Sequence, residues 1–147
     1  MNIRQDLKQR ILIIDGAMGT MIQRHKLEEK DYRGDRFKDW HTDVKGNNDL
    51  LSITQPDIIV GIHKQYLAAG ADILETNTFS STSIAQADYD MQSLAYELNV
   101  ASAKCARHAI NEYQQEQAAT NNGFSSSPLG EAGRGLVINT LQEPLAH

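Results

Sequence analysis

A small set of polar and small residues follows two short stretches of the chain that are rich in β-favouring apolar residues, 11–14 and 71–74. The set is Asp15, Gly16, Glu75, Thr76 and Asn77. An ionisable group at the end of a buried strand is costly unless it is used there. Two carboxylates brought together at one place could bind Mg²⁺ or act in acid–base catalysis.

The elements that must position these residues are two strands, predicted at residues 11–15 and 71–75. A continuous apolar run ended by glycine is typical of a strand that is buried on both faces, as in parallel sheets. In α/β barrels the active site is built at the carboxyl ends of the strands. The two carboxylates are therefore predicted to lie at the same end of one sheet.

Helices are predicted around these strands. The most distinct, residues 56–69, begins with Pro56 at its first position and ends before Gly70. Shorter or weaker patterns predict helices at 3–10, 17–25, 84–89 and 93–114, and a long loop with little regular structure at 28–49. A short connection from helix to strand is typical of parallel βαβ units. The predicted fold class is α/β, the first βα units of a (β/α)₈ TIM barrel, which is incomplete because such a barrel takes about 250 residues.

Composition narrows the function classes. The chain has 147 residues and a formal net charge of −5, without the clustered Lys and Arg that nucleic-acid binding requires. It has no apolar run long enough for a membrane span and no secretory signal, so we expect a cytoplasmic protein. Arg33, Arg36 and Lys38 alternate with acids and are interpreted as a solvated surface.

The spacing of the histidines and of the single cysteine does not predict a metal site. Cys105 is the single cysteine, which excludes a disulfide framework and a multi-cysteine metal site, and it is predicted to be a small core residue. His63 lies among apolar helix positions and is interpreted as a partly buried or surface helix histidine. His25, His41 and His108 have no partner at ligand spacing.

The character of the chain changes after residue 114. Residues 115–135 are rich in Gln, Asn, Ser and Gly, which predicts a flexible linker or an unrelated continuation. We therefore divide the chain into a partial barrel domain, 1–114, and a tail, 115–147. Residues 135–139 form a weak strand pattern with no evident partner.

Several motifs taken in order resemble a known family. Residues 15–20 and 71–79 resemble the homocysteine-binding barrel of the homocysteine S-methyltransferases. The segments between them, 32–37, 39–40 and 45–51, are similar to the N-terminal module of the cobalamin-dependent methionine synthases within that family. The resemblance covers residues 7–113.

This resemblance implies a substrate and a reaction. In the family, zinc held by three cysteines binds homocysteine as a thiolate, which takes a methyl group from methylcobalamin, or from betaine or S-methylmethionine in smaller relatives, to give methionine. Asp15 and Gly16 match the family's substrate-contacting pair, with Asp15 as ammonium partner or as organiser of the site. Glu75, Thr76 and Asn77 match the polar end of the second strand and would line the same site.

The three zinc cysteines match no position of this chain. We therefore expect no metal, no cofactor and no methyltransferase activity in this chain alone, with zinc and cobalamin implied for the full-length family. Two alternatives stay open. One is an incomplete domain that at most binds a small amino acid or self-associates through an exposed sheet edge; the other is a different barrel enzyme using strand-end carboxylates.

Overall fold

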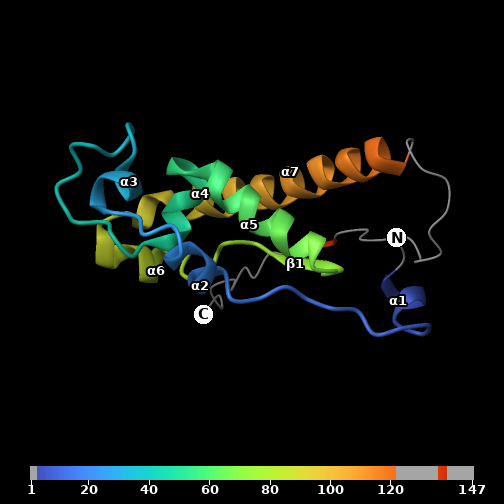
Figure 1. The fold of residues 1–147 in the computed structure, drawn as a ribbon. Helices are drawn as coiled ribbons and strands as arrows, with labels where there is room; N and C mark the ends of the chain where they lie inside the picture. Colours follow the sequence, from blue (N-terminus) through green and yellow to red (C-terminus); the bar gives the residue numbers. More distant parts are fainter. Residues whose placement is uncertain (1–2, 122–135, 139–147) are drawn as a thin grey trace, which may run out of the picture.

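The longest helix, α7 (Ala95–Asn121), runs along most of the molecule and packs against α5 (Pro56–Ala68) (Figure 1). These are elements of a computed structural model that describes residues 3–121 and 136–138. The predicted helix 56–69 is confirmed, with Pro56 in its first turn and Gly70 in the left-handed region (φ 101°) just after its end. The other helices are short: α1 (Ile3–Asp6), α2 (Met18–Gln23), α3 (Glu29–Arg33), η1 (Asn48–Leu50), α4 (Leu51–Thr54), α6 (Ser83–Gln86), η2 (Ala87–Tyr89) and η3 (Gln92–Leu94).

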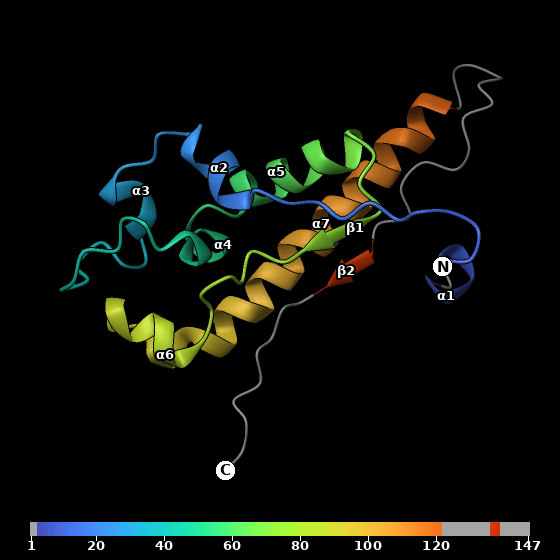
Figure 2. The same cartoon turned by 90° about the horizontal axis from the view of Figure 1, so that it is seen from below.

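A small parallel sheet lies beside these helices. Strand β1 (Ile73–Glu75) pairs in parallel with β2 (Leu136–Ile138), and Figure 2 shows the two strands side by side. On its other side β1 meets the extended segment around Ile14, through a parallel bridge between Ile14 and Ile73. The predicted strand 71–75 is thus confirmed over its last three residues. Residues 135–139 were predicted to lack a partner, which is wrong because β1 is that partner.

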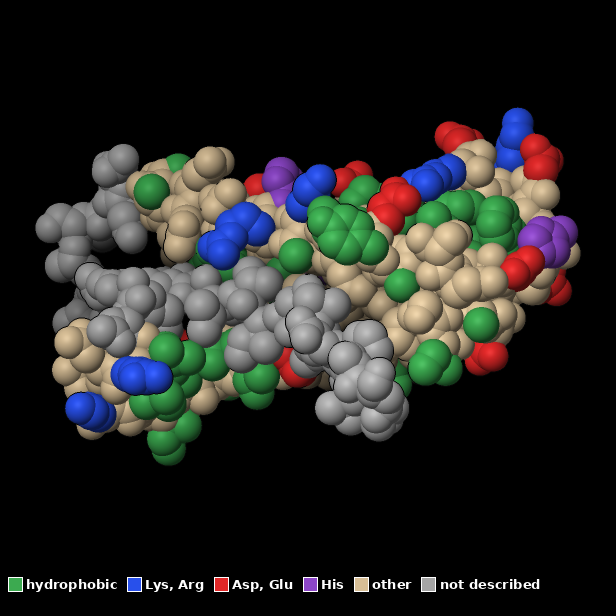
Figure 3. Space-filling view, turned by 180° about the vertical axis from the view of Figure 1, so that it is seen from behind, with side chains coloured by type: hydrophobic (Ala, Val, Ile, Leu, Met, Phe, Trp, Pro, Cys, Tyr) green, Lys and Arg blue, Asp and Glu red, His purple; other side chains and the backbone are tan. Residues whose placement is uncertain are grey.

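The predicted strand 11–15 is not a regular strand. Among the described residues, only Ile14 of this segment forms a bridge. The prediction of burial on both faces is wrong, since Ile11 is 86 % exposed and Ile13 is 59 % exposed. A strand is buried on both faces only where paired strands and helices cover it, and among the described residues this segment pairs with β1 alone. Figure 3 shows hydrophobic side chains gathered at the surface beside α1.

Helix α7 continues past the predicted start of the tail at residue 115. The segment after residue 113 is rich in Gln, Glu and Ala, which are good helix formers, so the helix extends to Asn121. Residues 122–135 and 139–147 of the predicted tail lie outside the described residues.

The predicted loop 28–49 is more ordered than its composition indicates. It contains α3, which starts with a capping box between Glu28 and Asp31, and it ends in η1. Tyr32, Phe37 and Val44 of this region are buried in the main core, together with Leu50 and Ile59 from the helices that follow. The region therefore packs as part of the fold.

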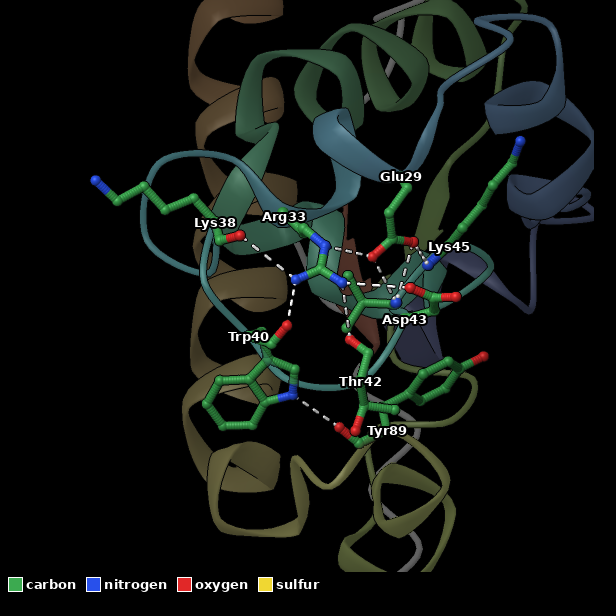
Figure 4. A network of polar contacts seen from close by, with 9 residues as sticks. Glu29, Arg33, Lys38, Trp40, Thr42, Asp43, Lys45 and Tyr89 are labelled. Atoms are coloured by element: carbon green, nitrogen blue, oxygen red, sulfur yellow. Dashed lines mark hydrogen bonds and ion pairs between the residues drawn. The ribbon is translucent and has the colours of Figure 1, made fainter.

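Arg33 organises this region, which corrects its interpretation as part of a solvated surface. Its guanidinium pairs with Glu29 and donates to the carbonyls of Trp40 and Thr42 (Figure 4). The Glu29 carboxylate in turn accepts the backbone N–H of Val44 at 2.9 Å. The planar guanidinium of Arg33, which has several donors, thus joins α3 to the segment that follows it.

We expect Arg33→Lys to lower the free energy of unfolding by about 1–3 kcal/mol, because a lysine ammonium cannot make the hydrogen bonds to Glu29, Trp40 and Thr42 at the same time. Urea unfolding monitored by circular dichroism measures the change. Arg36→Lys is the matched control. It alters the exposed pair with Glu97 and should cost less than about 1 kcal/mol. Equal losses in the two variants would contradict an organising role for Arg33.

No helix in the described part of the chain is long and apolar enough to cross a membrane.

Candidate functional site

A cleft of about 940 Å³ opens where the segment ending at Asp15 and strand β1 both end. The other walls come from the first turn of α2, the residues just before and within η1, the segment from β1 into α6, and η2. All five residues singled out by the sequence line it: Asp15, Gly16, Glu75, Thr76 and Asn77. The predicted convergence of the two strand ends is thus confirmed as geometry.

Asp15 is held firmly where it lines this cleft. It is only 9 % exposed, and its Oδ1 accepts the backbone N–H of Glu75 at 2.8 Å. Its own N–H donates to the carbonyl of Ile73 at 2.9 Å. The parallel pairing with β1 therefore fixes both the backbone and the carboxylate of Asp15.

Gly16 and Glu75 border the cleft with fewer constraints. Apart from Gly16 and its chain neighbours, no described residue has an atom within 4 Å of the place where a Cβ on Gly16 would lie, so packing does not require glycine there. The left-handed residue at this turn is Ala17 (φ 46°), which leads into α2. Glu75 is half-buried and lines the cleft. Close approach of a ligand to Gly16 stays a prediction.

Asn77 and Thr76 are buried and bonded within the protein. The Asn77 amide donates to the carbonyl of Asn48 at 2.8 Å and to the Ser52 hydroxyl at 3.2 Å. The Thr76 and Thr78 hydroxyls share a hydrogen bond of 2.8 Å. Asn77 therefore ties β1 to the loop that forms the opposite wall, which is a structural task beside any contact with a ligand.

Two residues that sequence reasoning missed also belong to this region. Asp49 lines the cleft, is 3 % exposed, and accepts the Ser80 N–H and the Ser81 hydroxyl through Oδ2, both at 2.7 Å. His63 of α5 is fully buried, which corrects its interpretation as a partly buried or surface residue. Its apolar neighbours at helical spacing were the signal for burial.

Burial raises the pKa of Asp49 above its ordinary value of 3.8, against the lowering effect of the Ser81 and Ser80 hydrogen bonds. The folded protein thus binds this proton more tightly than the unfolded chain does, so ionisation of Asp49 costs stability as the pH rises above 3.8. In Asp49→Asn, one amide oxygen can accept both hydrogen bonds without charge. We expect the stability of this variant relative to wild type to increase from pH 4 toward neutral pH in urea unfolding. A difference that does not change with pH would contradict this.

The cleft is acidic. Its lining includes the carboxylates of Asp15, Asp49, Glu75 and Asp88, and no Lys or Arg is among the described residues that line it. Clefts lined by one sign of charge concentrate ligands of the opposite sign. The arrangement suits a small ligand that carries a cationic group.

The described residues do not build a metal site. No group of three or more His, Cys, Asp or Glu side chains among them is placed to hold an ion. Cys105 is buried as predicted, its Sγ lies 3.7 Å from the carbonyl of Ser52, and burial raises the pKa of its thiol to about 11. A neutral, buried thiol of this kind is a core residue rather than a zinc ligand.

Comparison with known proteins finds a matching family and a solved structure of similar fold. The model of the family Homocysteine S-methyltransferase matches residues 12–139. The crystal structure of the homocysteine methyltransferase MmuM from Escherichia coli, in its oxidized form, is similar in fold, with a TM-score of 0.61 and 23 % sequence identity. That similarity covers 79 % of this chain and 36 % of the MmuM chain, so the present chain spans about a third of it.

The family match also corrects the boundary of the resemblance, which the sequence placed near residue 113. The matched region extends through α7 and β2 to residue 139. The division of the chain into a barrel domain, 1–114, and a flexible or unrelated tail, 115–147, stays a prediction. The match covers most of the chain, and this chain belongs to the homocysteine S-methyltransferase family.

Proposed function

We propose that this chain forms the homocysteine-binding end of a thiol methyltransferase of the cobalamin-dependent methionine synthase type. In this proposal the described elements are the first βα units of a (β/α)₈ barrel. The observation that carries it is the acidic cleft, in which Asp15 and Glu75 meet at the ends of two parallel, paired segments. A cytoplasmic location is part of the same proposal.

Asp15 is the residue proposed to hold the amino-acid end of homocysteine. Its Oδ1 is engaged by the Glu75 amide, which leaves Oδ2 to accept a hydrogen bond from the ligand's ammonium group. Glu75 adds negative charge in the same cleft, and Gly16 leaves room there for a ligand. Thr76 and Asn77 support this wall of the cleft from within the fold.

The methyl transfer itself needs a thiolate, which zinc supplies in the family by deprotonating the bound thiol. The whole chain contains one cysteine, so a zinc site with three cysteine ligands does not fit its residues. We assign no residue here to zinc or cobalamin. The proposed division is that this chain binds and orients the substrate and does not carry out methyl transfer alone.

Two assays on the purified chain test the proposal. L-homocysteine should raise the thermal midpoint of unfolding in a saturable way, because a ligand that binds only the folded state stabilises it. Incubation with homocysteine, methylcobalamin and zinc should yield no methionine by mass spectrometry. Absence of a saturable shift would contradict substrate binding. Methionine formation would contradict the proposed inactivity.

The exposed segment next to β1 favours association between copies of this chain. Ile11 and Ile13 expose most of their side chains, and exposed apolar strand segments promote association between chains. We propose that this chain self-associates through the segment. Sedimentation velocity should show concentration-dependent species in wild type and fewer in Ile13→Lys. A wild-type protein that stays monomeric at high concentration would contradict it.

A further inference from the structure

His63 is a buried polar side chain without a conventional partner. It lies on α5 and is 0 % exposed, and neither ring nitrogen has a hydrogen-bond partner in the described structure. Leaving such a group unbonded costs stability, so buried polar atoms without partners deserve an explanation. His63 is not among the residues that line the cleft.

The position of the ring relates it to Asp15. His63 Nδ1 lies 3.7 Å from Asp15 Oδ2, the oxygen that is not bonded to the Glu75 amide. The Asp15 carboxylate thus lies between a backbone N–H from β1 and an imidazole from α5. Of the carboxylates in the described residues, Asp15 is the one within ion-pair distance of this ring.

We propose that His63 is a positioning residue for Asp15, with its Nδ1–H directed at Oδ2. A neutral imidazole carries its single N–H on either Nδ1 or Nε2. A hydrogen on Nδ1 is attracted by the Asp15 carboxylate, whereas a lone pair on Nδ1 would be repelled by it, so the carboxylate favours the Nδ1–H tautomer. The separation is longer than a hydrogen bond, and hydrogen bonds in ligand-free sites are often long and shorten only in the complex with the ligand. A carboxylate oriented in advance loses less entropy when it binds an ammonium group. The identity of the ligand in this inference rests on the proposed function. The contact between His63 and Asp15 does not depend on that function.

The contact is tested first without any ligand, by ¹⁵N NMR of the histidine rings in the full chain. His63 should show the Nδ1–H tautomer, and Asp15→Asn should shift its ring signals while those of the exposed His108 stay in place. An Nε2–H tautomer in wild type, or His63 signals that Asp15→Asn leaves unchanged, would overturn the proposal. Because no homocysteine is present, this result stands whether or not the proposed function holds.

A matched pair of variants then tests positioning. His63→Asn keeps an N–H donor near the place of Nδ1, and His63→Leu keeps apolar bulk without a donor. By calorimetry His63→Leu should bind homocysteine about tenfold more weakly than wild type, as expected for loss of one hydrogen bond to a charged group, whereas His63→Asn should stay within about threefold. Equal loss in both folded variants would overturn positioning through a donor. If wild type itself does not bind homocysteine, the proposed function fails and the NMR result alone decides the contact.

Discussion

Asp15→Asn is expected to weaken homocysteine binding by about 10- to 100-fold, the range that a charge-assisted hydrogen bond to a buried carboxylate supports. Asparagine keeps an oxygen that can accept the Glu75 N–H, so the local backbone pairing is retained while the charge is lost. Isothermal titration calorimetry of wild type and variant measures the effect.

The control for Asp15→Asn is Asp88→Asn. Asp88 also lines the cleft, but it is exposed, so its charge is screened by water. Its removal should change the affinity by less than about threefold, in keeping with the small energies of solvent-exposed charges. Equal losses in the two variants would show that the cleft senses net charge only, without a dedicated ammonium partner.

Asn77→Ala is expected to lower the free energy of unfolding by about 2–4 kcal/mol, because it removes a buried amide whose two hydrogen bonds tie β1 to the opposite wall of the cleft. The carbonyl of Asn48 and the hydroxyl of Ser52 lose a donor, and a cavity opens beside them. Urea unfolding at neutral pH measures the loss. The sequence assigned this residue to the ligand, whereas its contacts indicate a support for the wall of the cleft.

The exposed amide Gln92 offers the comparison for Asn77. Gln92→Ala removes a similar group from the surface and should change the stability by less than about 0.5 kcal/mol. A stable Asn77→Ala variant that had lost only homocysteine binding would contradict the structural assignment and favour direct ligand contact.

The parts of this fold that the sequence predicts well depend on local signals. Helix α5 has a proline in its first turn, an apolar face at helical spacing and Gly70 after its end, and it forms within one residue of its predicted bounds. The carboxyl ends of parallel strands meet at one edge of a sheet. Because of this, the meeting of Asp15 and Glu75 in one cleft could be predicted even though the loops around it could not.

The parts that the sequence did not predict depend on contacts between distant segments. Burial of His63 follows from its place on α5, but its approach to Asp15 depends on how α5 packs against the sheet. Asp49 acquires its role from Ser80 and Ser81, which lie beyond β1. The Gln-rich stretch after residue 114 has a composition shared by linkers and by exposed helices, and its continuation from α7 favours the helix.

The central claim, that this cleft binds homocysteine through its ammonium group, is tested most directly by comparing two ligands on two proteins by calorimetry. The ligands are L-homocysteine and 4-sulfanylbutanoate, which lacks the amino group, and the proteins are wild type and Asp15→Asn. We predict that loss of the amino group weakens binding to wild type by about 10- to 100-fold and that the two ligands bind Asp15→Asn within about threefold of each other. Equal binding of both ligands to wild type, or an undiminished preference for homocysteine in Asp15→Asn, would contradict the claim.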